Sequence, residues 1–78
     1  MKKRSVNSLG HATSITLEEP FWKALKTEAE RENLSLNALI AKIDEQRTKT
    51  AQSDNLSSAI RLYILQQYQI RLLQQIVQ

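Results

Sequence analysis

The sequence predicts a mainly helical protein with one short strand. From Pro20 onward apolar residues recur at helical spacing, whereas only residues 11–17, with the sequence HATSITL, alternate as a strand does. The chain has 78 residues and no cysteine, so disulfides are excluded. Because a core of this size rarely supplies more than about 3–5 kcal/mol of net stability without help, we expect a second subunit to contribute.

The N-terminus is predicted to be a basic flexible arm. Residues 1–9 show no periodic pattern, and they begin with Lys2, Lys3 and Arg4. The net charge is +3, and no acidic residue occurs before Glu18. This distribution suits a polyanionic partner, and the alternative is a solvated tail that aids solubility.

The predicted strand has two different faces. Ile15 and Leu17 share one face and must meet a core, because alternate residues of a strand point to the same side. The opposite face is small and polar, and it carries Ala12, Ser14 and Thr16. Each backbone group buried without a hydrogen bond costs about 1–3 kcal/mol. Since no second strand is predicted, we expect this strand to pair antiparallel with the same strand of a second copy, giving a twofold homodimer.

Residues 10–47 are predicted to form a strand-helix-helix core. The first helix has Pro20 in its first turn and ends near Glu32, where Asn33 can adopt the left-handed conformation that terminates helices. Ser35 is expected to cap the second helix. The side chains expected to form the dimer core are Ile15, Leu17, Phe21, Trp22, Leu25, Leu36, Leu39, Ile40, Ile43 and Ile60.

The C-terminal third is predicted to be a loop followed by a long helix. The second helix is expected to fade around Gln46, and residues 48–54 are polar and aperiodic. Residues 55–78 are expected to form a helix that packs on the core or the dimer interface. Its outer stripe of Leu65, Tyr68, Leu72 and Ile76 has near-heptad spacing. This stripe is either a lengthened dimer interface or a docking surface for another protein or a higher oligomer.

Four sequence blocks occur in order along the chain. The first is GHATS, the second is LE with FW, the third is SLNALI with ID, and the fourth is NLSSAIR. The region that they mark runs from residue 4 to about residue 68. In these blocks the chain resembles the ribbon-helix-helix DNA-binding family, in particular a bacterial subgroup of it. The resemblance implies a small transcriptional regulator that binds double-stranded DNA as a homodimer, with a two-stranded ribbon in the major groove.

The resemblance also implies roles for individual residues. The outward side chains of the ribbon would contact base edges, and the N-terminus of the second helix would anchor a phosphate through its backbone N–H groups. The implied base-reading residues are Ala12, Ser14 and Thr16, and the implied phosphate contacts are Lys2, Lys3, Arg4, Ser35, Leu36 and Asn37.

Ala12 departs from the family pattern. We expect an arginine here in the bacterial subgroup, and alanine offers only a methyl contact to a base. The alternative function is therefore a dimeric protein-interaction module, antitoxin-like or an adaptor, in which sequence-specific DNA reading is weak or lost.

Several polar residues have ordinary structural interpretations. His11 is expected to be a satisfied polar residue rather than a phosphate contact or pH sensor. Asp44 and Glu45 are neighbours on a helix and point about 100° apart, so they do not form a catalytic pair. Arg61 is expected to pair with Asp44 or Asp54, and the alternative is that it approaches the DNA backbone.

Enzymatic and membrane functions are not expected. No nucleophile has a base and an orienting group nearby, and one glycine in the chain excludes a glycine-rich phosphate loop. One histidine and no cysteine exclude the common zinc sites, so we expect no metal and no cofactor. No apolar run reaches the roughly 18 residues that a membrane span needs, and we expect a cytoplasmic protein.

Overall fold

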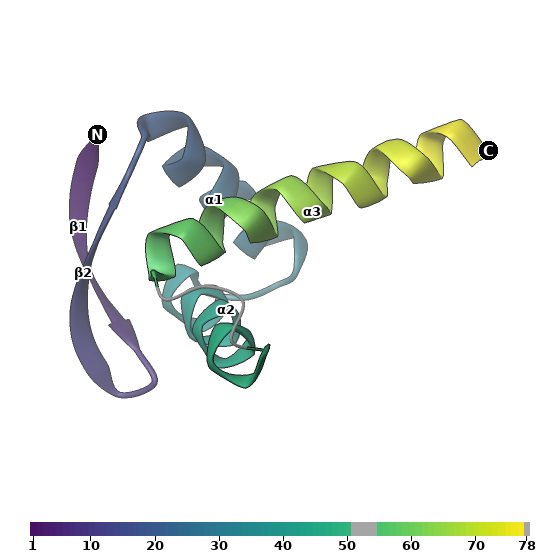
Figure 1. The fold of residues 1–78 in the computed structure, drawn as a ribbon. Coiled ribbons are helices and arrows are strands. Elements are labelled where there is room, and N and C mark those ends of the chain that lie inside the picture. Colours follow the sequence, from purple (N-terminus) through teal and green to yellow (C-terminus); the bar gives the residue numbers. More distant parts are fainter. Residues whose placement is uncertain (51–54, 78) are drawn as a thin grey trace.

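The computed structural model describes residues 1–50 and 55–77, and it confirms the mainly helical fold with an extra C-terminal helix. The elements are, in order, β1 (Lys2–Ser8), β2 (His11–Leu17), α1 (Glu19–Arg31), α2 (Leu36–Thr50) and α3 (Leu56–Val77). In Figure 1 the two strands form a hairpin on one side of the helices, and the C-terminal half of α3 extends away from that hairpin.

The hairpin corrects two predictions. Residues 2–8 form a strand rather than a flexible arm, and β2 pairs antiparallel with β1 of its own chain, from Lys2 opposite Leu17 to Ser8 opposite His11. One edge of β2 is therefore satisfied without a second copy. The strand was missed because Val6 is the one apolar residue in β1, which leaves the alternation too weak to recognise.

The residues of the turn between the strands also give no sequence signal for a hairpin. Leu9 and Gly10 both have positive φ, 54° and 81°, which is the conformation of a two-residue type I′ turn. Asn-Gly and Asp-Gly are the pairs that usually signal this turn, and leucine is unfavourable there because its Cβ crowds the backbone.

The two faces of the hairpin are chemically distinct. Cross-strand partners share a face, so Arg4 and Val6 of β1 lie on the same face as Ile15 and Thr13 of β2. Val6, Ile15 and Leu17 are buried against the helices. The outer face carries the other six paired residues: Lys3, Ser5 and Asn7 of β1, with Thr16, Ser14 and Ala12 of β2.

The ends of the helices follow the predicted capping chemistry. Asn33 has φ 58°, and the N–H of Leu34 donates to the carbonyl of Ala29 at 2.9 Å to close α1. The Ser35 hydroxyl accepts a hydrogen bond from the N–H of Ala38 at 3.1 Å, which caps α2. The Asn55 side chain accepts from the N–H of Ser57 at 2.8 Å in the same way.

Helix α2 is longer than predicted. It continues past Gln46 to Thr50, which includes residues 48–50 of the predicted loop, while residues 51–54 lie outside the described part of the chain. The extra turn has no apolar side chain to reveal it. An i,i+4 ion pair between Lys49 and Glu45, at 3.1 Å, supports it instead.

The core is built within one chain by the predicted apolar residues. All of them are buried except Phe21 and Leu36, which are half-buried at its border. To the residues predicted for the dimer core the structure adds Val6, Ala29, Tyr63 and Ile64, of which only Val6 lies outside the predicted helices. Whether a second copy shares this core stays a prediction.

Three polar contacts hold β1 against the helices. The Trp22 indole Nε1 donates to the carbonyl of Lys2 at 2.8 Å, and the Ser8 hydroxyl donates to Asp44 at 2.9 Å. The N–H of Asn7 donates to the side chain of Asn37 at 3.4 Å. Because these contacts reach α1 and α2, the orientation of the hairpin is fixed relative to the start of α2.

Helix α3 packs on the core through its N-terminal half. Arg61 pairs with Glu18 at 2.9 Å, which corrects the predicted pairing with Asp44, since Asp44 binds Arg47. The other predicted partner, Asp54, lies outside the described residues. Among residues 1–50 and 55–77, no helix combines the length and the apolar character needed to cross a membrane.

Candidate nucleic-acid interface

The outer face of the hairpin is a flat polar surface. Its β1 side chains are Lys3, Ser5 and Asn7, all exposed, and on β2 Ser14 is exposed while Thr16 is half-buried. An amine, an amide and hydroxyl groups together supply both hydrogen-bond donors and acceptors. The sequence predicted the β2 half of this face, whereas Ser5 and Asn7 were not predicted and Lys3 was assigned to a flexible arm.

Ala12 is exposed on this face as predicted, and its neighbour across the hairpin is Asn7. The methyl group of Ala12 therefore lies beside an amide. A long polar side chain is present on the face, although it comes from the strand that the sequence did not reveal.

The second edge of β2 is open. In a hairpin closed by a two-residue turn, the pair next to the turn is hydrogen-bonded, and such pairs alternate along the strands. Ser8 and His11 form that pair, so the backbone groups of Ala12, Ser14 and Thr16 point away from β1. Within the described residues, none of these groups bonds to another element.

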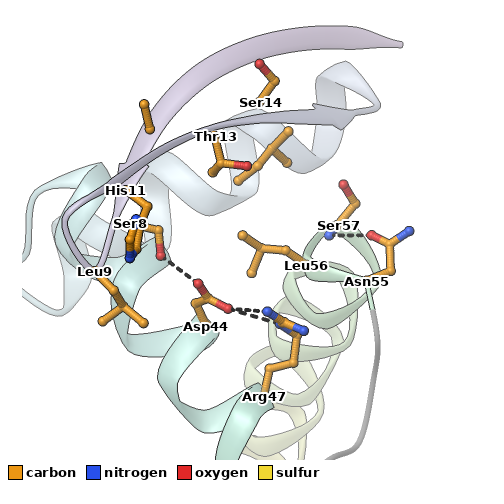
Figure 2. A pocket seen from close by; sticks show the side chains of 12 residues that line it. Ser8, Leu9, His11, Thr13, Ser14, Asp44, Arg47, Asn55, Leu56 and Ser57 are labelled. Carbon is orange, nitrogen blue, oxygen red and sulfur yellow. Dashed lines mark hydrogen bonds and ion pairs between the residues drawn. The ribbon is translucent and has the colours of Figure 1, made fainter.

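A hollow of about 520 Å³ lies beside this open edge. Figure 2 shows β2 on one side of it and, on the other, the Asp44–Arg47 ion pair of α2 and the first residues of α3. Arg47 binds Asp44 through two nitrogens, at 2.6 and 3.0 Å, which holds the carboxylate that accepts the Ser8 hydroxyl. His11 is exposed at the rim of the hollow.

Cations that form ion pairs and cations that form none lie on different elements of the fold. In the described part of the chain the paired cations lie on α2 and α3: Lys42, Arg47, Lys49, Arg61 and Arg71. The other cations, which form none of these ion pairs, lie on β1 and α1: Lys2, Lys3, Arg4, Lys23, Lys26 and Arg31. On β1 and α1 these six cations outnumber the two acids that also form none of these ion pairs, Glu19 and Glu30.

A second hollow, of about 240 Å³, gathers part of this surplus at the start of α2. It is lined by Arg4 of β1, by Glu19, Trp22, Lys23 and Lys26 of α1, and by Leu36, the first residue of α2, so three cations face one acid there. The Arg4 guanidinium stacks over the Trp22 ring at 5.2 Å, which holds it at the hollow. Lys23 and Lys26 were not predicted; their i,i+3 spacing on the exposed side of α1 was the available signal.

The predicted phosphate-binding residues at the start of α2 have separate positions. Leu36 lines the basic hollow, whereas the Ser35 hydroxyl is engaged in capping the helix. The Asn37 side chain accepts the N–H of Asn7. The N–H groups of Leu36 and Asn37 and the side chains of Lys23 and Lys26 are therefore the groups that an anion would meet here.

The carboxylates on the helical side are held ionised by their partners. A backbone hydrogen bond and the Arg61 guanidinium lower the pKa of Glu18. Burial raises the pKa of Glu32, but hydrogen bonds from Lys42 and Tyr63 outweigh it and lower the pKa below its ordinary value. Burial and the nearby Glu32 carboxylate in turn raise the pKa of the Tyr63 hydroxyl.

The described residues offer no clear place for a metal ion, since histidine and carboxylate side chains do not gather in groups of three within them. The arrangement instead combines a polar ribbon face, an open strand edge and a basic flank.

Comparison with known proteins gives one positive result. A family model described as a ribbon-helix-helix domain matches residues 1–68, which include both strands, α1, α2 and the first half of α3. No curated protein and no solved structure gives a significant match to the chain.

Proposed function

The chain belongs to the ribbon-helix-helix domain family, and from this premise we propose that it is a homodimeric DNA-binding protein that acts as a small transcriptional regulator. The observation that supports this function best is the outer face of the hairpin. It is polar and uncovered, and the unpaired cations of β1 and α1 flank it.

The dimer forms through the open edge of β2. The outward N–H and C=O groups of Ala12, Ser14 and Thr16 pair with the same groups of a second β2, running antiparallel. The hollow beside this edge leaves room for the second strand. The product is a four-stranded sheet in the order β1, β2, β2, β1, with its polar face continuous across the twofold axis.

The width of this sheet assigns different roles to its strands. Three strand spacings of about 4.8 Å place the two β1 strands about 14 Å apart, whereas the major groove is about 12 Å wide. The two β2 strands therefore enter the groove and present Ser14 and Thr16 to base edges. The β1 strands lie over the groove walls, where Lys3 of the outer face meets a phosphate, whereas Lys2, opposite Leu17, lies on the other face of the hairpin.

The flanking phosphates are held at the start of α2. The first-turn N–H groups of this helix and the helix dipole attract an anion. Arg4, Lys23 and Lys26, which line the hollow beside Leu36, add positive charge at the same place. Because Asn37 and Trp22 bind β1, this anchor keeps a fixed distance from the ribbon.

The alternative function, a module without base reading, was suggested by Ala12 and by the long C-terminal helix. The first of these reasons is weakened by the composition of the outer face. With β1 in place, the same face also carries Asn7 and Lys3, which are long enough to reach base edges.

Selection of bound sequences from a random pool of duplex DNA tests the function. We expect a palindromic site for the unaltered protein. Asn7→Ala and Ser14→Ala should alter the selected sequence, while Lys49→Ala, on the exposed side of α2, should leave it unchanged. If no sequence is enriched, or if the outer-face variants select the same site as the unaltered protein, base reading by this face is wrong.

A proline substitution tests the ribbon dimer. Ser14→Pro removes an N–H from the open edge but none from the hairpin, because Ser14 belongs to a pair that does not exchange hydrogen bonds. This variant should fold, lose the ribbon pairing and lose DNA binding. Ser14→Ala is the control and should keep the pairing. A Ser14→Pro protein that keeps the oligomeric mass of the Ser14→Ala protein would contradict the proposed pairing.

A further inference from the structure

Helix α3 exposes an unusual amount of apolar surface. Leu62 is 46% exposed, and the exposure rises along the helix to 71% at Ile76. Monomeric proteins seldom leave apolar patches larger than a few hundred Å² uncovered. In Figure 1 the C-terminal end of α3 projects beyond α1 and α2.

Five of the exposed residues of α3 follow a heptad pattern, and Tyr68, Ile70 and Leu73, which are also exposed, lie beside it. Successive members are separated by three and four residues in turn, as at the a and d positions of a coiled coil: Leu62, Leu65, Gln69, Leu72 and Ile76. We call this set the α3 seam. It lies on the side of the helix opposite to Ile60 and Ile64, which are buried in the core.

An apolar groove widens the seam at its N-terminal end. A hollow of about 490 Å³ lies between α1 and α3, and its walls include Pro20, Phe21 and Ala24 beside Leu62 and Leu65. Two heptads alone make a short coiled coil, so this groove supplies additional apolar area for a helix that lies along the seam.

The charges on α3 favour an identical partner over a charged one. The helix contains no acidic residue, and its two arginines are bound within the chain, Arg61 to Glu18 at 2.9 Å and Arg71 to Glu28 at 3.0 Å. The seam therefore offers no charge to attract a charged partner helix. It also presents no like charges that would repel a second copy.

Gln69 makes the seam self-complementary. It lies at the centre, with Leu62 and Ile76 seven residues away on either side. When two seams pair in parallel about a twofold axis, Gln69 meets Gln69. An amide both donates and accepts hydrogen bonds, so two copies satisfy one another, and a single polar residue at such a position fixes the register.

We infer that the α3 seam is a second interface between copies of this chain, separate from the ribbon. The seam extends away from the hairpin (Figure 1), so a copy bound along it leaves the open edge of β2 free. Two ribbon dimers joined through their seams form a tetramer, and this assembly presents more than one ribbon to DNA if the proposed function holds.

Charge substitutions at Gln69 test the inference. In sedimentation or native mass measurements at micromolar concentration, Gln69→Glu and Gln69→Lys should each halve the mass of the unaltered protein. Identical charges then face one another at the centre of the seam, and association should weaken about tenfold or more. A mixture of the two variants should regain the full mass, because the opposite charges pair.

The controls separate this interface from the ribbon and from other partners. Gln74→Lys introduces the same charge on an exposed residue outside the seam and should not change the mass. Ser14→Pro should halve the mass through the ribbon, and Ser14→Pro with Gln69→Lys should give a monomer. The inference is overturned if neither Gln69 variant changes the mass. It is also overturned if the mixture of the two Gln69 variants stays at half the mass, which is the result expected when the seam binds a different protein.

Discussion

Removing Lys23 and Lys26 should weaken the dependence of DNA binding on salt. These lysines line the basic hollow at the start of α2, and no ion pair in the described residues involves them. Each phosphate contact contributes about −0.9 to the slope of log K against log salt concentration. A dimer of the Lys23→Ala/Lys26→Ala variant loses up to four such contacts, so its slope should flatten by about 3.6.

The same relation gives the loss of affinity. If the electrostatic contribution vanishes near about 1 M salt, four contacts are worth about 10³–10⁴-fold in affinity at about 0.1 M salt. Fluorescence anisotropy with a labelled duplex, titrated at a series of salt concentrations, measures both the slope and the affinity.

Lys42→Ala/Lys49→Ala is the matched control. It removes the same charge, but these lysines are paired with Glu32 and Glu45 on the helical side. The control should change the slope by much less than the Lys23→Ala/Lys26→Ala variant does. Equal changes in the two proteins would mean that net charge alone matters, and an unchanged slope in the Lys23→Ala/Lys26→Ala protein would refute the phosphate anchor.

Three further predictions concern stability, and urea unfolding measures all of them. Leu9→Asn should raise the unfolding free energy by about 1 kcal/mol, because asparagine tolerates the positive φ of 54°, whereas Leu9→Ala keeps the strain and should give no gain. Leu25→Ala should cost about 2–5 kcal/mol, since Leu25 is fully buried, and a cost below about 1 kcal/mol would contradict its place in the core. The lowered pKa of Glu32 stabilises the fold above its ordinary pKa of 4.5, and this contribution is lost as pH falls through the lower folded value. Tyr63→Phe removes one of the hydrogen bonds that lower this pKa, so the urea midpoint of the variant should fall less steeply below pH 4.5 than that of the unaltered protein; an equally steep fall would count against the role of Tyr63.

The helical part of the fold was predictable because strong local signals agree with tertiary packing. Pro20, Asn33 and Ser35 mark helix ends by their own backbone and side-chain chemistry, and the structure places all three as predicted. The apolar stripe of α2 likewise identified Leu39 and Ile40, which are fully buried.

The N-terminal strand was not predictable because its stability does not come from an apolar pattern. β1 is held by cross-strand pairing and by contacts from distant residues, such as the Trp22 indole and the Asn37 side chain. Neither contact leaves a signal within residues 2–8. The β1 half of the outer face was not predictable either, because the position of Asn7 on that face depends on the pairing register of the hairpin.

Strand β1 also limits how the ribbon can assemble. A strand with two open edges can add copies on both sides and form an open sheet. Because β1 covers one edge of β2, only the edge of Ala12, Ser14 and Thr16 remains, and an antiparallel pair about a twofold axis uses it completely. The far edge of β1 is partly occupied, since Asn37 accepts the N–H of Asn7, and its charged residues Lys2 and Lys3 disfavour a further strand. The strand that supplies the basic flank of the proposed DNA surface therefore also limits the proposed sheet to four strands.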